Sequence, residues 1–157
     1  MDENKPTLGW REWVSLPDLG IDWIKTKVDT GARSSSLHAS EIEQIERDGE
    51  PWVRFVVLPW QRSDRDPITV EAVLHDTREI RSSTGDSQIR PVIRTTVRIG
   101  DRDEPIEVTL TDRADMRFRM LLGREAIRRH YVVSPSRSYR AGKPPKKIRA
   151  RNRERSK

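Results

Sequence analysis

Hydrophobic and polar residues alternate along most of this chain, which is the pattern of β-strands with one buried and one exposed face. The clearest alternating runs are residues 23–28, 41–46, 52–58, 68–74, 92–99 and 106–111. Asp48-Gly49 separates two of these runs and Gly100-Asp101 separates two others, and such pairs favour tight hairpin turns. Many short strands joined by frequent turns predict an all-β barrel or sandwich.

Two stretches depart from this alternation. Residues 120–122 are a short apolar run, Met-Leu-Leu, which ends at Gly123 and predicts a brief buried strand. Residues 124–131 carry apolar side chains at helical spacing and predict one short helix near the C-terminus.

A polar segment over residues 76–90 lies between two of the expected strands. Its tip, residues 82–86, is small and polar and includes Ser83, Thr84 and Gly85. Such tips are typical of hairpin lids that close over a substrate, although an ordinary exposed hairpin has the same composition. From its composition alone the segment is therefore either a mobile lid or an ordinary exposed hairpin turn.

The overall composition predicts a single domain with a small core. A third of the residues are hydrophobic, so assembly with a second copy would help to bury apolar surface. The chain has no cysteine, which excludes disulfides and thiolate metal sites. No apolar run is long enough to span a membrane and the N-terminus lacks a signal-peptide pattern, so we expect a cytoplasmic protein with no membrane contact.

The positive charge is concentrated at the C-terminal end. The 157 residues include 31 Lys and Arg and 25 Asp and Glu, for a formal net charge of +6. Residues 134–157 hold ten of the bases and one acid, so this end carries +9 and the rest carries −3. Because residues 141–157 are proline-rich and poor in apolar side chains, we expect a disordered basic tail. Such a tail suits contact with RNA or a ribosome, or else it is a solvated end without a partner.

The candidate chemistry lies at the end of the first expected strand, where the chain reads Asp29-Thr30-Gly31-Ala32. An Asp-Thr-Gly turn after a strand holds a carboxylate on a tight loop, although the tripeptide is also common in ordinary turns. The segment Leu-Leu-Gly-Arg at residues 121–124 follows later and changes this interpretation. Together the two motifs resemble the active-site scaffold of pepsin-type aspartic proteases in the single-domain form of the retroviruses.

A wider pattern runs through residues 9–17, 25–39, 92–97, 116–124 and 134–139. On these stretches the chain is similar to the bacterial RimB group, often labelled "ATP-dependent zinc protease" and associated with the glutamate ligase RimK. The resemblance implies a retropepsin-like domain over residues 8–140, with the tail at 141–157 outside it. The implied fold is a closed β-barrel or sandwich with a flap hairpin and one short C-terminal helix.

The resemblance also implies roles for individual residues. Asp29, with Thr30 and Gly31, would be catalytic, and Gly123 would pack beneath their loop. These enzymes need two carboxylates, and the later Asp-Thr at residues 76–77 is not followed by glycine. A homodimer that pairs two Asp29 side chains at a two-fold axis is therefore implied. The substrate, a peptide or protein, would be bound by Ala32, Arg33, Ser83, Thr84, Gly85 and Arg124.

The label attached to the group does not fit these residues. Zinc hydrolases need about three His, Asp or Glu ligands in a recognisable arrangement, whereas His38, His75 and His130 are far apart in the sequence. A phosphate-binding loop needs Gly-Lys followed by Ser or Thr, whereas Gly142-Lys143 is followed by proline. We therefore expect no metal and no cofactor.

One position departs from the retroviral pattern. Retroviral enzymes carry acidic residues after Asp-Thr-Gly-Ala, one of which pairs with the arginine of the second motif, whereas this chain has Arg33 there. Arg33 and Arg124 then need a carboxylate between them, which either Glu125 or a substrate supplies. The second alternative leads to the hypothesis of a cleft that prefers acidic peptides, such as glutamate-rich tails of a RimK-modified ribosomal protein.

Two other functions remain open. One is a ribosome- or RNA-associated binding module on an inactive protease scaffold, and the other is a regulator of the glutamate ligase with weak peptidase activity. Deleting residues 141–157 separates the binding module from the main hypothesis, because a binding module would lose its partner whereas a peptidase would keep its chemistry.

Overall fold

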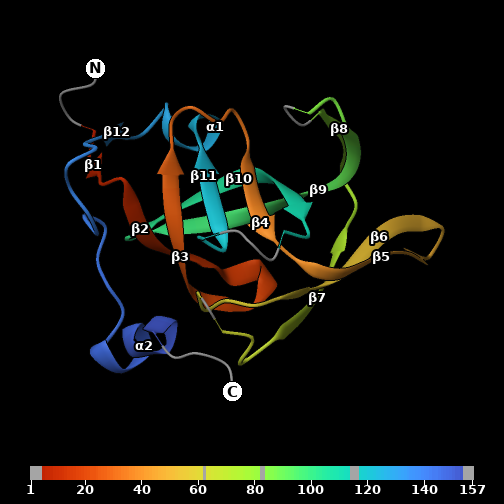
Figure 1. Ribbon diagram of the computed structural model, residues 1–157, viewed down its shortest axis with the longest axis horizontal. Coiled ribbons are helices and arrows are strands. Elements are labelled where there is room, and N and C mark those ends of the chain that lie inside the picture. The colour runs from red at the N-terminus through yellow and green to blue at the C-terminus, as the bar shows by residue number, and fades with distance from the viewer. Residues whose placement is uncertain (1–4, 62, 82–83, 114–116, 154–157) are drawn as a thin grey trace.

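The computed structural model describes the chain except for residues 1–4, 62, 82–83, 114–116 and 154–157 (Figure 1). In chain order the strands are β1 (Thr7–Leu8), β2 (Arg11–Leu16), β3 (Ile21–Asp29), β4 (Ser35–His38), β5 (Ser40–Arg47), β6 (Glu50–Val57), β7 (Ile68–Val73), β8 (Asp76–Arg81), β9 (Ser87–Ile99), β10 (Arg102–Thr111), β11 (Met120–Gly123) and β12 (Val132–Val133). The helices are α1 (Arg124–Ile127) and α2 (Lys146–Ala150), with 3₁₀ turns at Pro17–Leu19 and Arg151–Arg153. The prediction of an all-β fold is confirmed.

The largest sheet curls into a ring. Its strands lie in the order β10-β4-β11-β3-β2-β9-β8, and β10 also pairs with β9, so β8 stands outside the closed part. Alternate residues of the ring strands point inward, where Ile24, Leu37 and Leu122 are completely buried. The ring closes between β2 and β9 through a single residue pair, Ser15 opposite Arg98. It is therefore less regular than the closed barrel that the sequence led us to expect.

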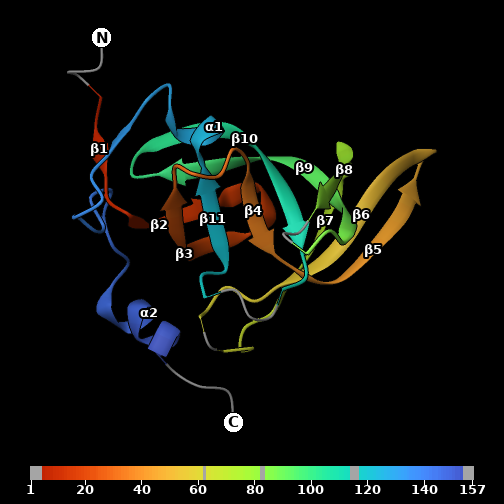
Figure 2. The ribbon, with the colours of Figure 1, turned by 45° about the horizontal axis from the view of Figure 1, so that its top comes forward.

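A second sheet of β5, β6 and β7 extends away from the ring (Figure 2). Asp48 and Gly49 link β5 to β6 with φ angles of 52° and 79°, the left-handed conformation that a two-residue hairpin turn requires. Phe55 of β6 is completely buried and joins this sheet to the core. The predicted hairpin is confirmed.

The helix after β11 is shorter than expected. It ends at Ile127 rather than near Tyr131, although Tyr131 still donates its backbone N–H to the Ile127 carbonyl at 3.0 Å. The β-branched pair Val132–Val133 that follows lies parallel to β1. Strand pairing of these two residues takes the chain out of the helical path. None of the described helices has the length and apolar character that crossing a membrane would require.

The C-terminal segment differs most from expectation. We expected residues 141–157 to be disordered, but residues 141–153 lie against the ring and include α2. The buried carboxylate of Glu12 accepts the backbone N–H groups of Arg140 at 2.9 Å and Ala141 at 3.0 Å. Buried Asn152 accepts the backbone N–H of Gln61 at 3.0 Å. Polar contacts with distant residues therefore order a segment whose own composition predicts disorder.

Glu12 should be important for stability because it satisfies three backbone donors, the third being Gly9 at 2.6 Å. Glu12→Gln removes the charge and turns an NH₂ group toward these donors. We expect the free energy of unfolding to fall by about 2 kcal/mol, measured by urea denaturation. Glu50→Gln, at an exposed position, is the control. Equal stability of both variants would contradict an anchoring role for Glu12.

Candidate active site

Asp29 ends β3 at the rim of the ring. Its Oδ1 accepts the backbone N–H of Gly31 at 3.1 Å, and its carbonyl accepts the N–H of Ala32 at 3.2 Å. The carboxylate is therefore held by the tight turn that Asp-Thr-Gly forms. Asp29 is half-buried, whereas Thr30 and Gly31 are exposed. One carboxylate is thus presented at the rim with its orientation fixed by the backbone.

The second motif supports this loop from below. β11 lies parallel to β3, with Gly123 beside Asp29. The loop carbonyls of Ala32 and Arg33 accept the N–H groups of Arg124 at 2.8 Å and Glu125 at 3.1 Å. Figure 1 shows α1 beside the loop between β3 and β4, and Figure 2 shows the same contact from another side. The two motifs of the sequence therefore form one structure.

Gly123 packs beneath the loop, as the resemblance implied. A Cβ atom on Gly123 would lie 2.5 Å from the carbonyl carbon and oxygen of Ser34 and 2.9 Å from the oxygen of Arg33. These are backbone atoms, so they could not move aside without moving the loop. The Gly123 N–H also donates to the Ser35 hydroxyl at 3.1 Å, which makes Ser35 a supporting residue of the site.

The two arginines of the site have partners within the chain. Arg33 Nε lies 3.2 Å from Glu125 Oε1, and Arg128 lies 3.3 Å from the other oxygen of that carboxylate. Arg124 Nη1 donates to the carbonyl of Gly31 at 3.3 Å. Of the two alternatives considered for Arg33, the structure contains the pair with Glu125. Arg33 therefore needs no substrate carboxylate to balance its charge.

The expected flap is a hairpin of β8 and β9, with Arg81 opposite Ser87 at its outer end. Thr84 and Gly85 are exposed at its tip, and Ser83 lies outside the described residues. The hairpin contacts the Asp29 loop through Arg78, whose Nη1 donates to the Ser34 hydroxyl at 3.4 Å. The predicted tip residues therefore remain untested as substrate contacts. The contact between the hairpin and the Asp29 loop comes from Arg78, which the sequence did not single out.

A cleft of about 440 Å³ lies between this loop, β8, β10 and α1, and its lining includes Arg33, Arg78, Glu107 and Ala126. Glu107 accepts from Arg78 Nη2 at 3.0 Å and lies 3.0 Å from His75 Nε2. The hydrogen bond from Arg78 lowers the pKa of the Glu107 carboxyl. Glu107 is thus a charged partner that holds the base of the hairpin. Neither Arg78 nor Glu107 belongs to a motif, so only the fold brings them to the site.

The histidines do not form a cluster. His38 is buried and accepts the N–H of Arg113 through Nδ1, His75 contacts Glu107, and His130 lies 3.5 Å from Glu104. In the part of the chain that the structure describes, no group of three His, Asp or Glu side chains is placed to hold a metal ion.

Comparisons with known proteins agree with this geometry. Residues 7–144 match the family described as "RimB-like: Retropepsin-like aspartic endopeptidase RimB". A solved structure of a protein of unknown function from Legionella pneumophila, Lpg0085, superposes with a TM-score of 0.72 at 30% identity. That superposition covers 87% of this chain and 98% of the Legionella chain.

The curated relatives are longer proteins. A "Probable alpha-L-glutamate ligase" of Shewanella pealeana is 44% identical over 142 residues, which are 90% of this chain and 31% of that protein. A protein of the same name from Desulfotalea psychrophila is 43% identical over 135 residues, 86% of this chain and 29% of the relative. The chain thus spans less than a third of the length of these relatives.

Proposed function

Because the chain belongs to the RimB-like family of retropepsin-like aspartic endopeptidases, we propose that it hydrolyses peptide bonds with two Asp29 carboxylates, one from each copy of a homodimer. The observation that carries this proposal is the backbone-fixed carboxylate of Asp29 at the rim of the ring. The chain has a single Asp-Thr-Gly, so the second carboxylate has to come from another copy.

The chemistry follows from the closeness of the two carboxylates. Two such groups about 3 Å apart cannot both ionise, so they share one proton and titrate as a pair. The ionised member takes a proton from a water held between them, and the water oxygen attacks the scissile carbonyl carbon. The protonated member donates to the carbonyl oxygen. When the C–N bond breaks, the proton taken from water passes to the amine. One hydroxyl of the tetrahedral intermediate returns its proton to the other carboxylate as the new C=O bond forms, so the pair again shares one proton.

For the substrate we propose acidic peptides, including the glutamate-rich tails that the RimK association suggests. The names of the curated relatives support this, since they describe the longer proteins as probable glutamate ligases. The same names favour one alternative, in which this chain regulates a glutamate ligase and its own peptidase activity is weak. A peptide library cut by the wild type but not by a variant lacking Asp29 would decide for the peptidase.

The dimer gives a further prediction. Activity per molecule should fall as the protein is diluted below its dimer dissociation constant, because a monomer has one carboxylate where the reaction needs two. The measurement is the initial rate of peptide cleavage over a dilution series, with sedimentation velocity at the same concentrations. A rate strictly proportional to concentration while the protein sediments as a monomer would contradict the homodimeric site.

A further inference from the structure

A second pocket, of about 320 Å³, lies where the C-terminal segment meets the outer face of β2 and β3. Five cationic side chains line this basic pocket: Arg11, Lys25, Arg117, Lys143 and Arg149. Within the described part of the chain, its lining includes no Asp or Glu, and none of the five cations is paired with a carboxylate. Like charges gathered in this way repel one another unless an anion binds between them.

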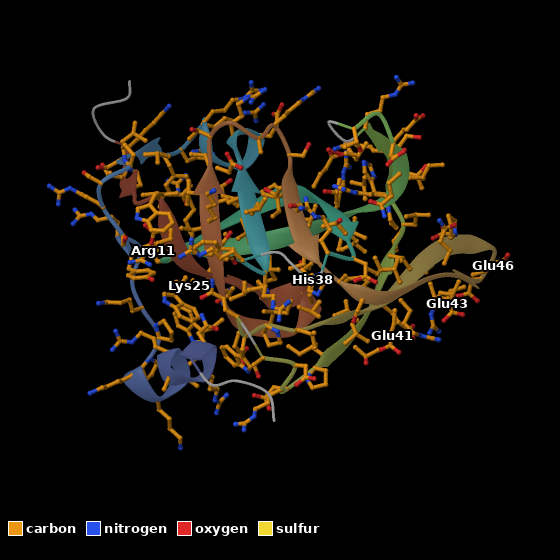
Figure 3. The ribbon with its side chains drawn as sticks, in the orientation of Figure 1. Arg11, Lys25, His38, Glu41, Glu43 and Glu46 are labelled. Atoms are coloured by element: carbon orange, nitrogen blue, oxygen red, sulfur yellow. The ribbon has the colours of Figure 1, made fainter. Side chains whose placement is uncertain are left out.

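Several acids of the chain lie away from this pocket. In Figure 3, Arg11 and Lys25 lie between the N-terminal strands and the C-terminal segment, whereas Glu41, Glu43 and Glu46 lie on the distant β5–β6 hairpin. Glu12, the acid next to Arg11 in sequence, is completely buried and is occupied by backbone N–H groups. Arg117 and Lys143 are exposed and the other three cations are half-buried, so the positive charge of the basic pocket faces solvent.

Aromatic rings hold the cations together. The guanidinium of Arg11 lies 5.0 Å from the ring centroid of Tyr139, and the ammonium groups of Lys25 and Lys143 lie at 5.5 Å and 5.9 Å from it. Arg11 also lies 4.7 Å from the ring of Trp10. Cation–π contacts of this kind fix the positions of cations without neutralising their charge. The pocket is thus prearranged for a ligand with several negative groups.

Arg149 of α2 contributes one wall of the pocket. The Nε of Arg149, on α2, is buried and makes no hydrogen bond among the described residues. Arg149 and Lys143 both come from the C-terminal segment, so the ordering of this segment on the ring builds one side of the pocket.

The basic pocket is connected to the Asp29 loop along β3. Lys25, Lys27 and Asp29 alternate with buried residues, so their side chains share the outer face of this strand. Lys27 lines an adjoining pocket of about 360 Å³, which shares Trp10, Arg117 and Phe118 with the basic pocket. At the strand repeat of about 3.3 Å per residue, Lys25 and Asp29 are about 13 Å apart. An extended peptide covers this distance with four residues.

We propose that the basic pocket binds the side-chain carboxylates of an acidic peptide segment that lies about four residues from the bond presented to Asp29. The proposed binding depends only on the residues of the pocket, whereas its link to cleavage rests on the proposed peptidase function. The C-terminal segment then serves as part of the substrate site.

The pocket fits carboxylates better than nucleic acid. Binding single-stranded RNA commonly depends on bases stacked on free aromatic faces. Here cations lie over the rings of Trp10, Tyr139 and Phe118, so these faces are already engaged. What remains for a ligand is a compact group of N–H donors, and such donors bind carboxylates directly.

The test is binding of fluorescein-labelled hexaglutamate to the full chain by fluorescence anisotropy at physiological ionic strength. We expect Lys25→Gln combined with Arg149→Gln to weaken binding by about tenfold or more. The matched control is Lys146→Gln combined with Lys147→Gln, which removes the same charge from exposed positions of α2 outside the pocket. The control should change affinity by less than about twofold. Should Arg149→Gln melt α2, Lys25→Gln with Lys143→Gln replaces the first pair.

Three results would overturn the proposal. They are no binding of hexaglutamate by the wild type, an equal loss in the control pair, or tighter binding of a short single-stranded RNA that displaces the peptide. Performing the measurement in the Asp29→Asn background separates this inference from the proposed function. If hexaglutamate binds but the wild type cleaves no peptide, the peptidase function is refuted and the binding site stands. If the wild type cleaves peptides and the double substitutions in the pocket leave the cleavage rate unchanged, only the binding site is refuted.

Discussion

Asp29→Asn should abolish peptide cleavage while leaving the fold intact, with a loss of at least about 10⁴-fold in kcat/KM. An amide cannot take a proton from water, so the pair loses its base in both copies at once. The half-buried Asn keeps an oxygen that can accept the Gly31 N–H, so the loop should retain its conformation. The measurement is the cleavage rate of a glutamate-tailed peptide by mass spectrometry, with circular dichroism to verify folding.

The control for this variant is Asp76→Asn. Asp76 also precedes a threonine, is exposed, and accepts the N–H of Thr77 at 2.8 Å, but it lies on the hairpin strand β8 outside the Asp29 loop. Its replacement should leave the rate unchanged. Equal rates for the wild type and Asp29→Asn would show that Asp29 is not the catalyst.

Gly123→Ala should destabilise the protein by about 3 kcal/mol and reduce activity with it. The added Cβ would overlap backbone atoms of Ser34 and Arg33, so the loop that carries Asp29 has to shift. The parallel register that places Gly123 beside Asp29 transmits this shift to the carboxylate. Urea denaturation and the cleavage rate measure the two effects.

Gly31→Ala is the matched control for stability. A Cβ on Gly31 meets only the Asp29 Oδ1 atom, at 3.3 Å, and this side chain can adjust. We expect its free energy of unfolding to lie within about 1 kcal/mol of the wild type. A Gly123→Ala variant as stable as Gly31→Ala would mean that the loop adapts without cost and that the tight packing is not required.

The sequence predicted those features that depend on local patterns. Alternation places Ile24 and Val28 inward and Lys25 and Lys27 outward on β3, because side chains on a strand point to opposite faces. Asp48-Gly49 predicted its hairpin because few residue pairs adopt the backbone angles that the turn needs. The contact between the Asp-Thr-Gly and Leu-Leu-Gly-Arg motifs was predicted only from the family resemblance. Parallel pairing of β3 with β11 places the two motifs side by side.

Features that depend on distant contacts could not be predicted in this way. Strand β4 has the sequence Ser-Ser-Leu-His, which has no strand pattern, and it forms because β10 and β11 pair with it on both sides. The C-terminal segment is ordered by Glu12 and Asn152, whose roles no local pattern reveals. The basic pocket was predictable only in part. The alternation of Lys25, Lys27 and Asp29 places them on one face of β3, but the other wall of the pocket comes from α2, which no local pattern places there.

The central claim, a site shared by two copies, is tested most directly by mixing wild-type protein with Asp29→Asn at constant total concentration and letting the subunits exchange. If each site needs both carboxylates, activity follows the square of the wild-type fraction, and an equal mixture retains about a quarter of full activity. A loss in proportion to the wild-type fraction, with about half of the activity remaining, would show that one Asp29 suffices and would contradict the shared site.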